Sequence, residues 1–341
     1  MNGHRIALFA NHDSRQLLTL RDILVERGEP PLVCDIQLGG PTQPKVFLSG
    51  STAFWNDHDF KTVKAVHIRC TAVNTLPLLP AVMNEISFNE RRTDFIREQH
   101  HQAVTFGFFD HLTALGKLVV NPLTSAYLDH DSKAQFYEKL RAAGFDTPRT
   151  LSTNDPDRAR RFIDEFPETV VKPAIGIGST RVISRQDQHR LDEICACPVM
   201  LQERVFGDTI RVPIVVDTVV LALRILSDGG VDSRTNTRGF EYFAMPEEEQ
   251  VRIVRANRFL GLHYAAWDII AAPDGRFSYL DCNPGPFIMW IGRENTHTVL
   301  SQLANYLITF AHTESLEAAS QAVSACPRET TGISASGVDA R

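Results

Sequence analysis

Three oxygen-bearing side chains stand close together in two neighbouring apolar segments near the C-terminal end of the chain. Asp281 and Asn283 are two residues apart, so their side chains share one face of an extended strand. Asp268 lies in the apolar run 266–271, and a Pro-Asp-Gly turn at 273–275 predicts a hairpin that joins this run to the strand of Asp281. Two carboxylates and an amide oxygen suit a hard cation such as Mg²⁺. The alternative is a strand-end Asp followed by an ordinary Asn-Pro turn.

A glycine-rich segment follows a short apolar run that ends in a lysine. Lys172 closes the run Val-Val-Lys, and the loop 176–180 contains Gly176, Gly178 and Ser179. Glycines let backbone N–H groups approach an anion closely, and the lysine adds positive charge. Because the lysine precedes the glycines, this is not a Walker loop. The alternative is a plain hairpin turn with an exposed lysine.

The segment between these two clusters could meet a nucleotide. Gln202, Glu203 and Val205 lie where a predicted strand runs into a short connector, and such backbone can face a purine edge. Arg211 and Arg224 lie on neighbouring predicted strands and could bind a phosphate or carboxylate bidentately. The alternative for both arginines is an exposed sheet face.

The elements that must position these residues follow two patterns. Up to about residue 120 the chain alternates strands at 5–10, 31–36 and 63–68 with helices, which predicts an open, mostly parallel sheet. No G-x-G-x-x-G follows the first strand, so a dinucleotide site is not indicated. Beyond a helix at 133–143, capped by Ser132, most segments read as short strands. The fold class expected is therefore α/β, with α+β character in parts.

Composition excludes several classes of protein. The chain has 341 residues, of which 43% are hydrophobic and 22% charged, which fits two or three globular domains. A formal net charge of −6 disfavours a duplex DNA binder, and no apolar run is long enough to cross a membrane. Six scattered cysteines and no recognisable signal peptide indicate reduced thiols in the cytoplasm. The acid-flanked histidines His58 and His130 are more typical of solvated loops than of metal sites.

Several short motifs occur in a fixed order between about Asn121 and Phe310. They are the helix that begins at Lys133, Val171-Lys172-Pro173 with its glycine loop, Gln202-Glu203, Asp208-Thr209-Ile210-Arg211, Asp268, and Asp281-Cys282-Asn283-Pro284. Taken together, this ordered set resembles the ATP-grasp superfamily, and within it the ribosomal-protein glutamate ligases.

The chain is most similar to one branch, the microviridin-type (graspetide) peptide macrocyclases. This similarity rests on Val66-His67-Ile68-Arg69, Asn121-Pro122, Pro148-Arg149-Thr150, Thr153-Asn154-Asp155-Pro156, Asp232-Ser233-Arg234, and Asn283-Pro284 followed by Trp290-Ile291. The resemblance implies an ATP-grasp fold in which two α+β subdomains hold the nucleotide behind an N-terminal open α/β (pre-ATP-grasp) domain. The expected boundaries are 1–125 for that domain, 126–205 and 206–315 for the central and C-terminal subdomains, and 316–341 for a disordered tail.

The resemblance also implies residue roles. The residues implied for ATP are Lys133, Lys172, Gly176, Gly178, Ser179, Gln202, Glu203 and Val205. The lysines would contact the phosphates and the adenine side of the pocket, the glycine loop would form a lid, and the last three residues would meet adenine. Asp268, Asp281 and Asn283 would hold Mg²⁺. Arg211, with Arg224 nearby, would stabilise the phosphoryl group or an acyl phosphate, and Lys172 would assist.

Three positions depart from the family pattern. Thr209 occupies the slot of the usual ribose-binding acid, and Asp208 could substitute although its side chain should point the other way. The metal acid is Asp281 rather than the commoner Glu. After Asn283-Pro284, the macrocyclases usually show a polar Gly-Gln-Trp run, whereas this chain reads Gly-Pro-Phe-Ile-Met-Trp at 285–290.

The implied activity is that of an ADP-forming ligase that joins a carboxylate to an amine or hydroxyl through an acyl phosphate, with ATP and Mg²⁺. One hypothesis is a cytoplasmic peptide-modifying enzyme of natural product biosynthesis, with Arg91, Arg92 and Arg97 available to an acidic leader. A second is a ligase of free amino acids or small metabolites, and a third is a non-catalytic ATP-binding regulatory protein. Proteins of this branch often form dimers or tetramers, so a homo-oligomer is compatible. Neither a nucleic acid nor a membrane is expected as a partner.

Overall fold

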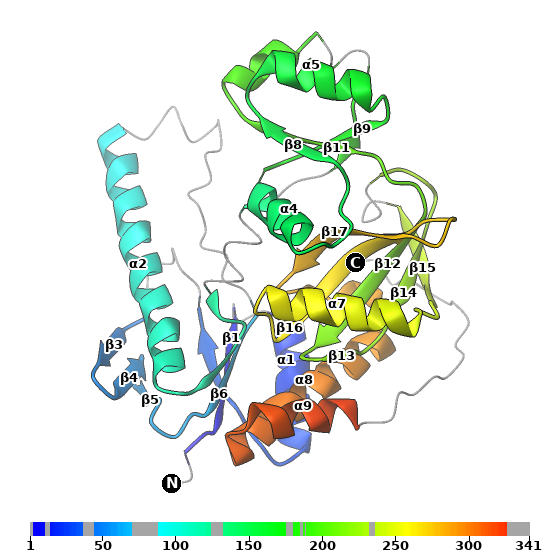
Figure 1. Cartoon of the computed structure of the whole chain (residues 1–341). Coiled ribbons are helices and arrows are strands. Elements are labelled where there is room, and N and C mark those ends of the chain that lie inside the picture. The colour runs from blue at the N-terminus through cyan, green and yellow to red at the C-terminus, as the bar shows by residue number, and fades with distance from the viewer. Residues whose placement is uncertain are drawn as a thin grey trace. The chain divides into compact units, whose positions relative to one another are not determined.

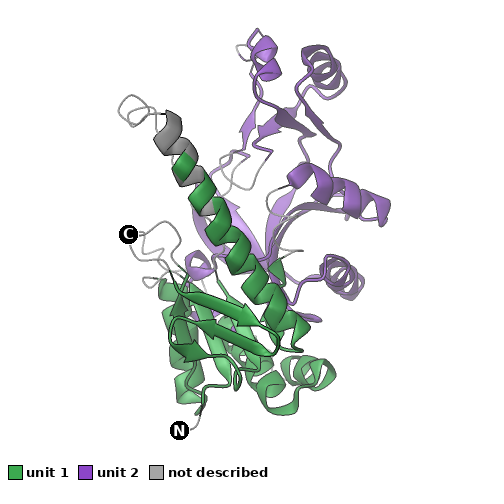
Figure 2. Cartoon of the chain, turned by 90° about the vertical axis from the view of Figure 1, so that its left-hand side faces the viewer, with its two compact units in different colours: residues 1–123, 300–326 green, residues 124–299, 327–341 purple. Residues whose placement is uncertain are grey.

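The structure, a computed structural model, describes residues 3–10, 14–36, 44–69, 88–123, 132–174, 180–184, 187, 189–231 and 236–325 (Figure 1). The chain forms two compact units. Unit 1 consists of residues 1–123 and 300–326, and unit 2 of residues 124–299 and 327–341 (Figure 2). No helix among the described residues combines the length and apolar character that crossing a membrane requires.

Unit 1 is built on a parallel sheet, as the alternating strands and helices predicted. Its strand order is β2-β1-β6-β7, with β1 at Ile6–Ala10, β2 at Leu32–Asp35, β6 at Ala65–Ile68 and β7 at Leu118–Val120. Helix α1 (Arg15–Glu26) connects the first two strands, and the Ser14 hydroxyl caps it by accepting a hydrogen bond from the Leu17 amide. The short strands are fully buried where both faces of the sheet are covered.

A second layer of unit 1 was not predicted from the sequence. Strands β3 (Val46–Ser49), β4 (Thr52–Trp55) and β5 (His58–Asp59) form an antiparallel sheet that contacts the long helix α2 (Phe88–Ala114). An aromatic cluster joins these layers, because the ring of Phe9 meets that of Trp55 edge to face at 5.0 Å and that of Phe109 at 4.8 Å. Arg97 is exposed on α2, whereas the side chains of Arg91 and Arg92 lie outside the described residues.

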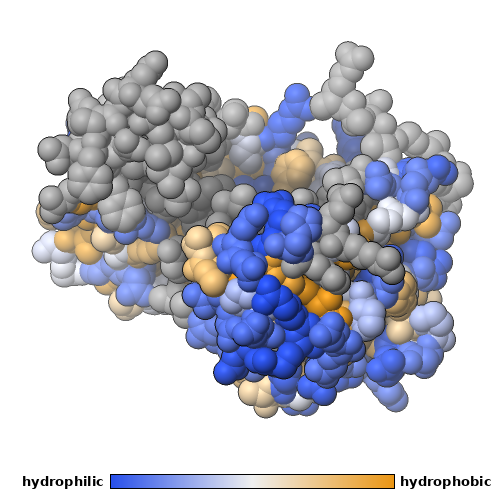
Figure 3. All heavy atoms as spheres, turned by 90° about the horizontal axis from the view of Figure 1, so that it is seen from above, coloured by the Kyte–Doolittle hydropathy of each residue, from blue (hydrophilic) through white to orange (hydrophobic). Residues whose placement is uncertain are grey.

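Unit 2 begins with a small sheet covered by one helix. Its strand order is β10-β9-β11-β8, with β8 at Thr150–Thr153, β9 at Thr169–Lys172, β10 at Arg181–Val182 and β11 at Val199–Glu203. Helix α5 (Pro156–Glu165) starts directly after Asp155, whose carboxylate accepts from the Asp157 and Arg158 amides. Figure 3 views the molecule from the α5 end, where hydrophilic side chains dominate around a strip of hydrophobic ones.

The larger sheet of unit 2 is antiparallel and has the strand order β15-β14-β12-β16-β17, with β13 paired to β12. The strands are β12 (Asp208–Val215), β13 (Thr218–Val219), β14 (Leu223–Ser227), β15 (Thr237–Tyr242), β16 (Tyr264–Ala271) and β17 (Phe277–Asn283). Helices α4 (Lys133–Ala142) and α7 (Glu247–Phe259) contribute to the apolar core on one face of this sheet, which contains Phe136, Ile210 and Trp267. Short 3₁₀ turns occur at Leu191–Cys195 and Met289–Ile291.

The C-terminal region corrects one expectation. The sequence from 316 onward was predicted to be disordered, yet Leu316–Ser324 forms helix α9 after α8 (Arg293–Thr313). Ser315 caps α9 by accepting from the Ala318 amide at 3.2 Å. Ala319 and Val323, one helical turn apart, are buried, so two small apolar residues suffice to anchor the helix. Residues 326–341 lie outside the described part of the chain.

Candidate active site

Unit 2 contains a pocket of about 550 Å³, a volume typical of sites for small ligands. Both sheets of the unit and helix α4 supply its walls. The predicted site residues that line it are Lys133, Lys172, Gln202, Glu203, Val205, Arg211, Asp268, Asp281 and Asn283. Gly176, Gly178 and Ser179 lie outside the described residues, but Lys172 and Thr180 on either side of that loop line the pocket.

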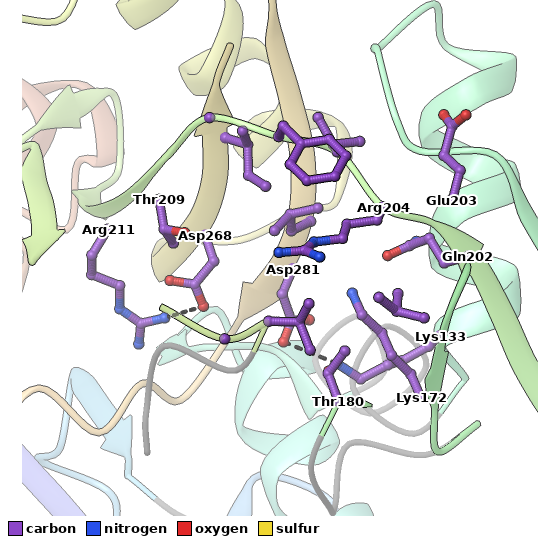
Figure 4. Close-up of a pocket in the computed structure, with 18 of the residues that line it drawn as sticks. Lys133, Lys172, Thr180, Gln202, Glu203, Arg204, Thr209, Arg211, Asp268 and Asp281 are labelled. Atoms are coloured by element: carbon purple, nitrogen blue, oxygen red, sulfur yellow. Dashed lines mark hydrogen bonds and ion pairs between the residues drawn. The ribbon is translucent and has the colours of Figure 1, made fainter. Parts of the chain in front are cut away.

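The register of the large sheet brings the charged residues into one row. In the predicted β16–β17 hairpin, Asp281 lies directly opposite Asp268, and in the β12–β16 pair Asp268 lies opposite Arg211. Directly opposed residues in antiparallel strands point to the same face. A register shift between Asp268 and Ile269 interrupts the regular pairing just beyond this point. The two acids and the arginine therefore lie side by side on the pocket face of the sheet (Figure 4).

Both carboxylates of this row are paired with a cation. Arg211 donates to Asp268 at 2.7 Å, and the Lys133 ammonium donates to Asp281 at 2.9 Å (Figure 4). The Arg211 side chain is only 5% exposed, so its charge is held in a poorly solvated place. Burial raises the pKa of Asp268, and the adjacent Arg211 opposes that shift by favouring the carboxylate form. The three charges of the row and that of Lys133 thus balance in two pairs.

Helix α4 aims its polar side chains at the same place. Lys133 and Tyr137 are one turn apart on the helix and share a face. The Tyr137 hydroxyl donates to the Leu280 carbonyl and accepts from the Lys172 ammonium at 3.4 Å. Burial, and then the negative charge of Asp281, raise the pKa of Tyr137, so it stays a neutral donor. Two lysines from different elements therefore converge beside Asp281.

The strand β11 and its connector to β12 form the opposite end of the pocket (Figure 4). Gln202 is buried and donates to the Thr150 hydroxyl at 2.9 Å, while the Glu203 carboxylate accepts from the Arg149 amide at 2.8 Å. These two bonds hold the end of β11 in place. Arg204 lies over the ring of Phe206 at 4.6 Å, and both line the pocket. Sequence reasoning missed this pair, although an aromatic residue two positions after an arginine was a visible signal.

Two predicted residues are not part of the pocket lining. Arg224 lies opposite Ile210, whose side chain is in the apolar core, so the register directs Arg224 away from Arg211. The Arg224 guanidinium pairs with Asp208 at 2.9 Å. Asp208 precedes Thr209 on β12 and alternation places it on the core side, whereas Thr209 lines the pocket. The expected proximity of Arg224 to Arg211 is therefore corrected, and Asp208 does not reach the slot that Thr209 fills.

The donor set fits a hard divalent cation. Asp268, Asp281 and Asn283 come from two adjacent strands and offer only oxygen ligands, which Mg²⁺ prefers. Their two negative charges are balanced by Lys133 and Arg211, so a divalent ion could replace two monovalent charges without a net change in charge. Among the described residues no cluster of three or more His, Cys, Asp or Glu side chains could bind a metal ion, which excludes a histidine- or thiolate-rich site there.

Comparisons with known proteins show what fold this chain has. The family model for an ATP-grasp domain matches residues 130–235. A solved structure of the ATP-grasp ligase PsnB complexed with minimal precursor is similar to this chain, with 27% identity and a TM-score of 0.77 over 89% of this chain and 98% of PsnB. No curated protein sequence matches significantly.

Two more distant structures share the fold. The macrocyclase MdnC bound with precursor peptide MdnA, from Microcystis aeruginosa, is 19% identical with a TM-score of 0.69, covering 89% of this chain and 99% of MdnC. A Chryseobacterium gregarium RiPP-associated ATP-grasp ligase is 16% identical with a TM-score of 0.67, covering 87% of this chain and 95% of its own. The fold and the matched domain lead to one conclusion: residues 130–235 form an ATP-grasp domain, and this chain has the fold of the ATP-grasp ligases.

Proposed function

We propose that the chain is an ATP-dependent, ADP-forming ligase that activates a side-chain carboxylate of a peptide and joins it to an amine or hydroxyl. The observation that carries the proposal is the row Asp281, Asp268 and Arg211 on one sheet face, with Lys133 and Lys172 beside it in one pocket. Such a cluster has the charges needed to hold a triphosphate, a metal ion and a carboxylate together.

The pocket has room for each part of the nucleotide in order. The base would lie at the connector of Gln202, Glu203 and Val205, and the phosphates would lie at Lys133 and Lys172. Asp268, Asp281 and Asn283 hold Mg²⁺. When bound, Mg²⁺ supplies positive charge that lowers the repulsion between the triphosphate and the incoming carboxylate.

The reaction has two displacement steps. A carboxylate oxygen of the acceptor attacks the γ-phosphorus of ATP, the bond to the β,γ-bridging oxygen breaks, and ADP leaves. An amine or hydroxyl then attacks the acyl carbon and inorganic phosphate leaves, while the nucleophile loses a proton. Arg211 exchanges its contact with Asp268 for the transferring phosphoryl group and stabilises its negative charge. The enclosed site positions the reactants, which is the larger part of its contribution.

A peptide substrate is supported by similar solved structures. PsnB, at 27% identity, has been solved with its minimal precursor and with the precursor peptide PsnA2 and AMPPNP. The same ligase has been solved with Mg and ADP. We extend the precursor-peptide substrate, ATP and Mg²⁺ to this chain. We also propose that the reaction takes place in the cytoplasm, which supplies ATP and would keep Cys195 and Cys197, exposed free thiols, reduced.

Mass spectrometry tests this function directly. Purified protein is incubated with ATP, Mg²⁺ and short acidic peptides, including those encoded beside its gene. The expected result is one lost water per bond formed, together with one ADP. Free amino acids and small carboxylates serve as the comparison set, because the competing ligase would act on those instead. Nucleotide binding without ADP formation in every mixture would support the regulatory alternative.

A further inference from the structure

The row of charges on the large sheet continues into an aromatic surface. Arg211 lies opposite Leu223 on β14, and Leu223 lies opposite Tyr242 on β15. The same face thus passes from two carboxylates through an arginine to a buried leucine and a tyrosine that is 43% exposed. This face of the sheet is therefore charged toward β17 and apolar toward β15.

The segment after β17 completes this apolar side. Trp290 and Phe287 both line the pocket, and the Trp290 ring lies 5.7 Å from the Arg211 guanidinium. Trp290 is fixed in place, because its indole donates to the Phe287 carbonyl at 2.9 Å and its ring meets Phe240 edge to face at 5.1 Å. We call Phe240, Tyr242, Phe287 and Trp290 the aromatic wall.

Phe287 is the member of the wall that is both exposed and part of the pocket. Its side chain is 53% exposed, and Pro284 and Pro286 restrict the backbone that presents it. A large apolar side chain left open in a binding pocket gains free energy when a ligand covers it. A nucleotide cannot be that ligand if its base lies at the far end, beside Gln202, and its phosphates lie at the lysines. What remains on this side of Arg211 is the acceptor.

We infer that Phe287, supported by Trp290, selects peptides with an apolar residue directly beside the reacting acid. The inference rests on the proposed function, because that function places the acceptor carboxylate at Arg211. With the carboxylate there, the neighbouring residue of the peptide lies against the aromatic wall. A polar residue at that position of the peptide loses its hydrating water and gains no hydrogen-bond partner from the aromatic wall. A peptide with such a residue therefore binds less tightly.

The test compares two synthetic pentapeptides, acetyl-Ser-Leu-Glu-Leu-Ser-amide and acetyl-Ser-Ser-Glu-Ser-Ser-amide. Each is titrated into protein saturated with Mg²⁺ and ADP, and binding is followed by tryptophan fluorescence. Trp55 and Trp267 are fully buried, so the change reports Trp290. The leucine peptide is expected to bind about tenfold more tightly than the serine peptide.

Substitution tests whether Phe287 is responsible for this preference. Phe287→Ser should reduce the preference to less than about twofold while ADP affinity is unchanged, and Phe287→Leu should retain most of it. The indole anchor survives both changes because it uses the Phe287 backbone carbonyl. Phe259→Ser is the matched control, since Phe259 is 52% exposed on α7 and does not line the pocket.

The outcomes separate the two proposals. Equal binding of both peptides to the wild-type protein, binding of neither, or loss of the preference in Phe259→Ser overturns the inference. If ADP and Mg²⁺ bind in these titrations, such a result leaves the proposed function standing. If calorimetry shows no binding of ADP, both proposals are overturned together.

Discussion

The two faces of the large sheet each carry an arginine in an ion pair, but only one of these arginines faces the pocket. On the pocket face, Arg211 is almost fully buried and pairs with Asp268. On the other face, Arg224 is 35% exposed and pairs with Asp208 and Glu241 at the rim of the apolar core. Both arginines come from adjacent strands, β12 and β14. The difference shows that the register, more than residue type, determines which charge can act on a ligand.

Each face should therefore respond to mutation in its own way. A change on the pocket face should reduce turnover and leave folding nearly intact. A change on the core face should reduce stability and leave the turnover of the folded molecules nearly intact. Five predictions follow from this contrast, from the largest expected effect to the smallest.

Asp281→Ala should reduce kcat/KM for ATP by about a thousandfold or more, because the site loses a metal ligand and the partner of Lys133. ADP release by the purified variant measures this loss. Asp274→Ala is the control, since Asp274 lies in the turn of the same hairpin and pairs with Arg276. Unchanged ADP release by Asp281→Ala would refute the assignment of the metal site.

Ile269→Ala should lower the free energy of unfolding by about 3 kcal/mol, because Ile269 is fully buried on the core face and the truncation leaves a cavity. Denaturant unfolding measures the change. Activity per folded molecule should stay near that of the wild type. A variant with full stability and lost turnover would show that the two faces are not separate in function.

Arg211→Met should reduce kcat/KM by about a hundredfold, because no other cation on that strand row can stabilise the phosphoryl group. Arg224→Met should cost no more than about threefold, since a half-exposed ion pair contributes little. Steady-state kinetics of both variants measure the two losses in kcat/KM. An equal loss in the two would restore the role that the sequence indicated for Arg224.

Lys133→Met should increase the affinity for Mn²⁺ in the absence of nucleotide by about tenfold, because the ammonium no longer competes with the metal ion for Asp281. Electron paramagnetic resonance of free Mn²⁺ measures this affinity without turnover. Lys139→Met on the same helix is the control. A weaker affinity of Lys133→Met for Mn²⁺ would mean that the Lys133 ammonium does not compete with the metal ion for Asp281.

Glu249→Gln should stabilise the protein by at most about 1 kcal/mol at pH 8, and less at pH 4. Glu249 is buried and accepts from the Tyr279 hydroxyl at 2.7 Å, and burial raises the pKa of Glu249. A raised pKa in the folded state means that stability is highest below the unfolded value and falls as the pH rises through the folded value. Thermal melting at both pH values measures the difference, and a larger gain at pH 4 would contradict the sign.

Much of the site was predictable because its signals are local. The turn at 273–275 was enough to predict that Asp268 and Asp281 lie on adjacent strands. The parallel sheet of unit 1 followed from strands and helices in alternation. In each case the signal for the element lies in residues that are close together in the sequence.

Other features depend on contacts between distant residues. The side to which Arg224 points depends on its pairing with Ile210, and no residue near Arg224 encodes that register. Helix α9 depends on burial of Ala319 and Val323, which the many small residues of this segment conceal. The sheet β3-β4-β5 is held by aromatic packing across the chain, as between Phe9 and Trp55.

The transfer of oxygen from substrate to phosphate tests the central claim most directly. A peptide substrate with ¹⁸O in its side-chain carboxylates is incubated with the protein, ATP and Mg²⁺, and the released phosphate is examined by mass spectrometry. An acyl phosphate on the path predicts one ¹⁸O atom in the phosphate for each bond formed, and none with Asp281→Ala. Phosphate that carries no ¹⁸O while bonds form would contradict the account.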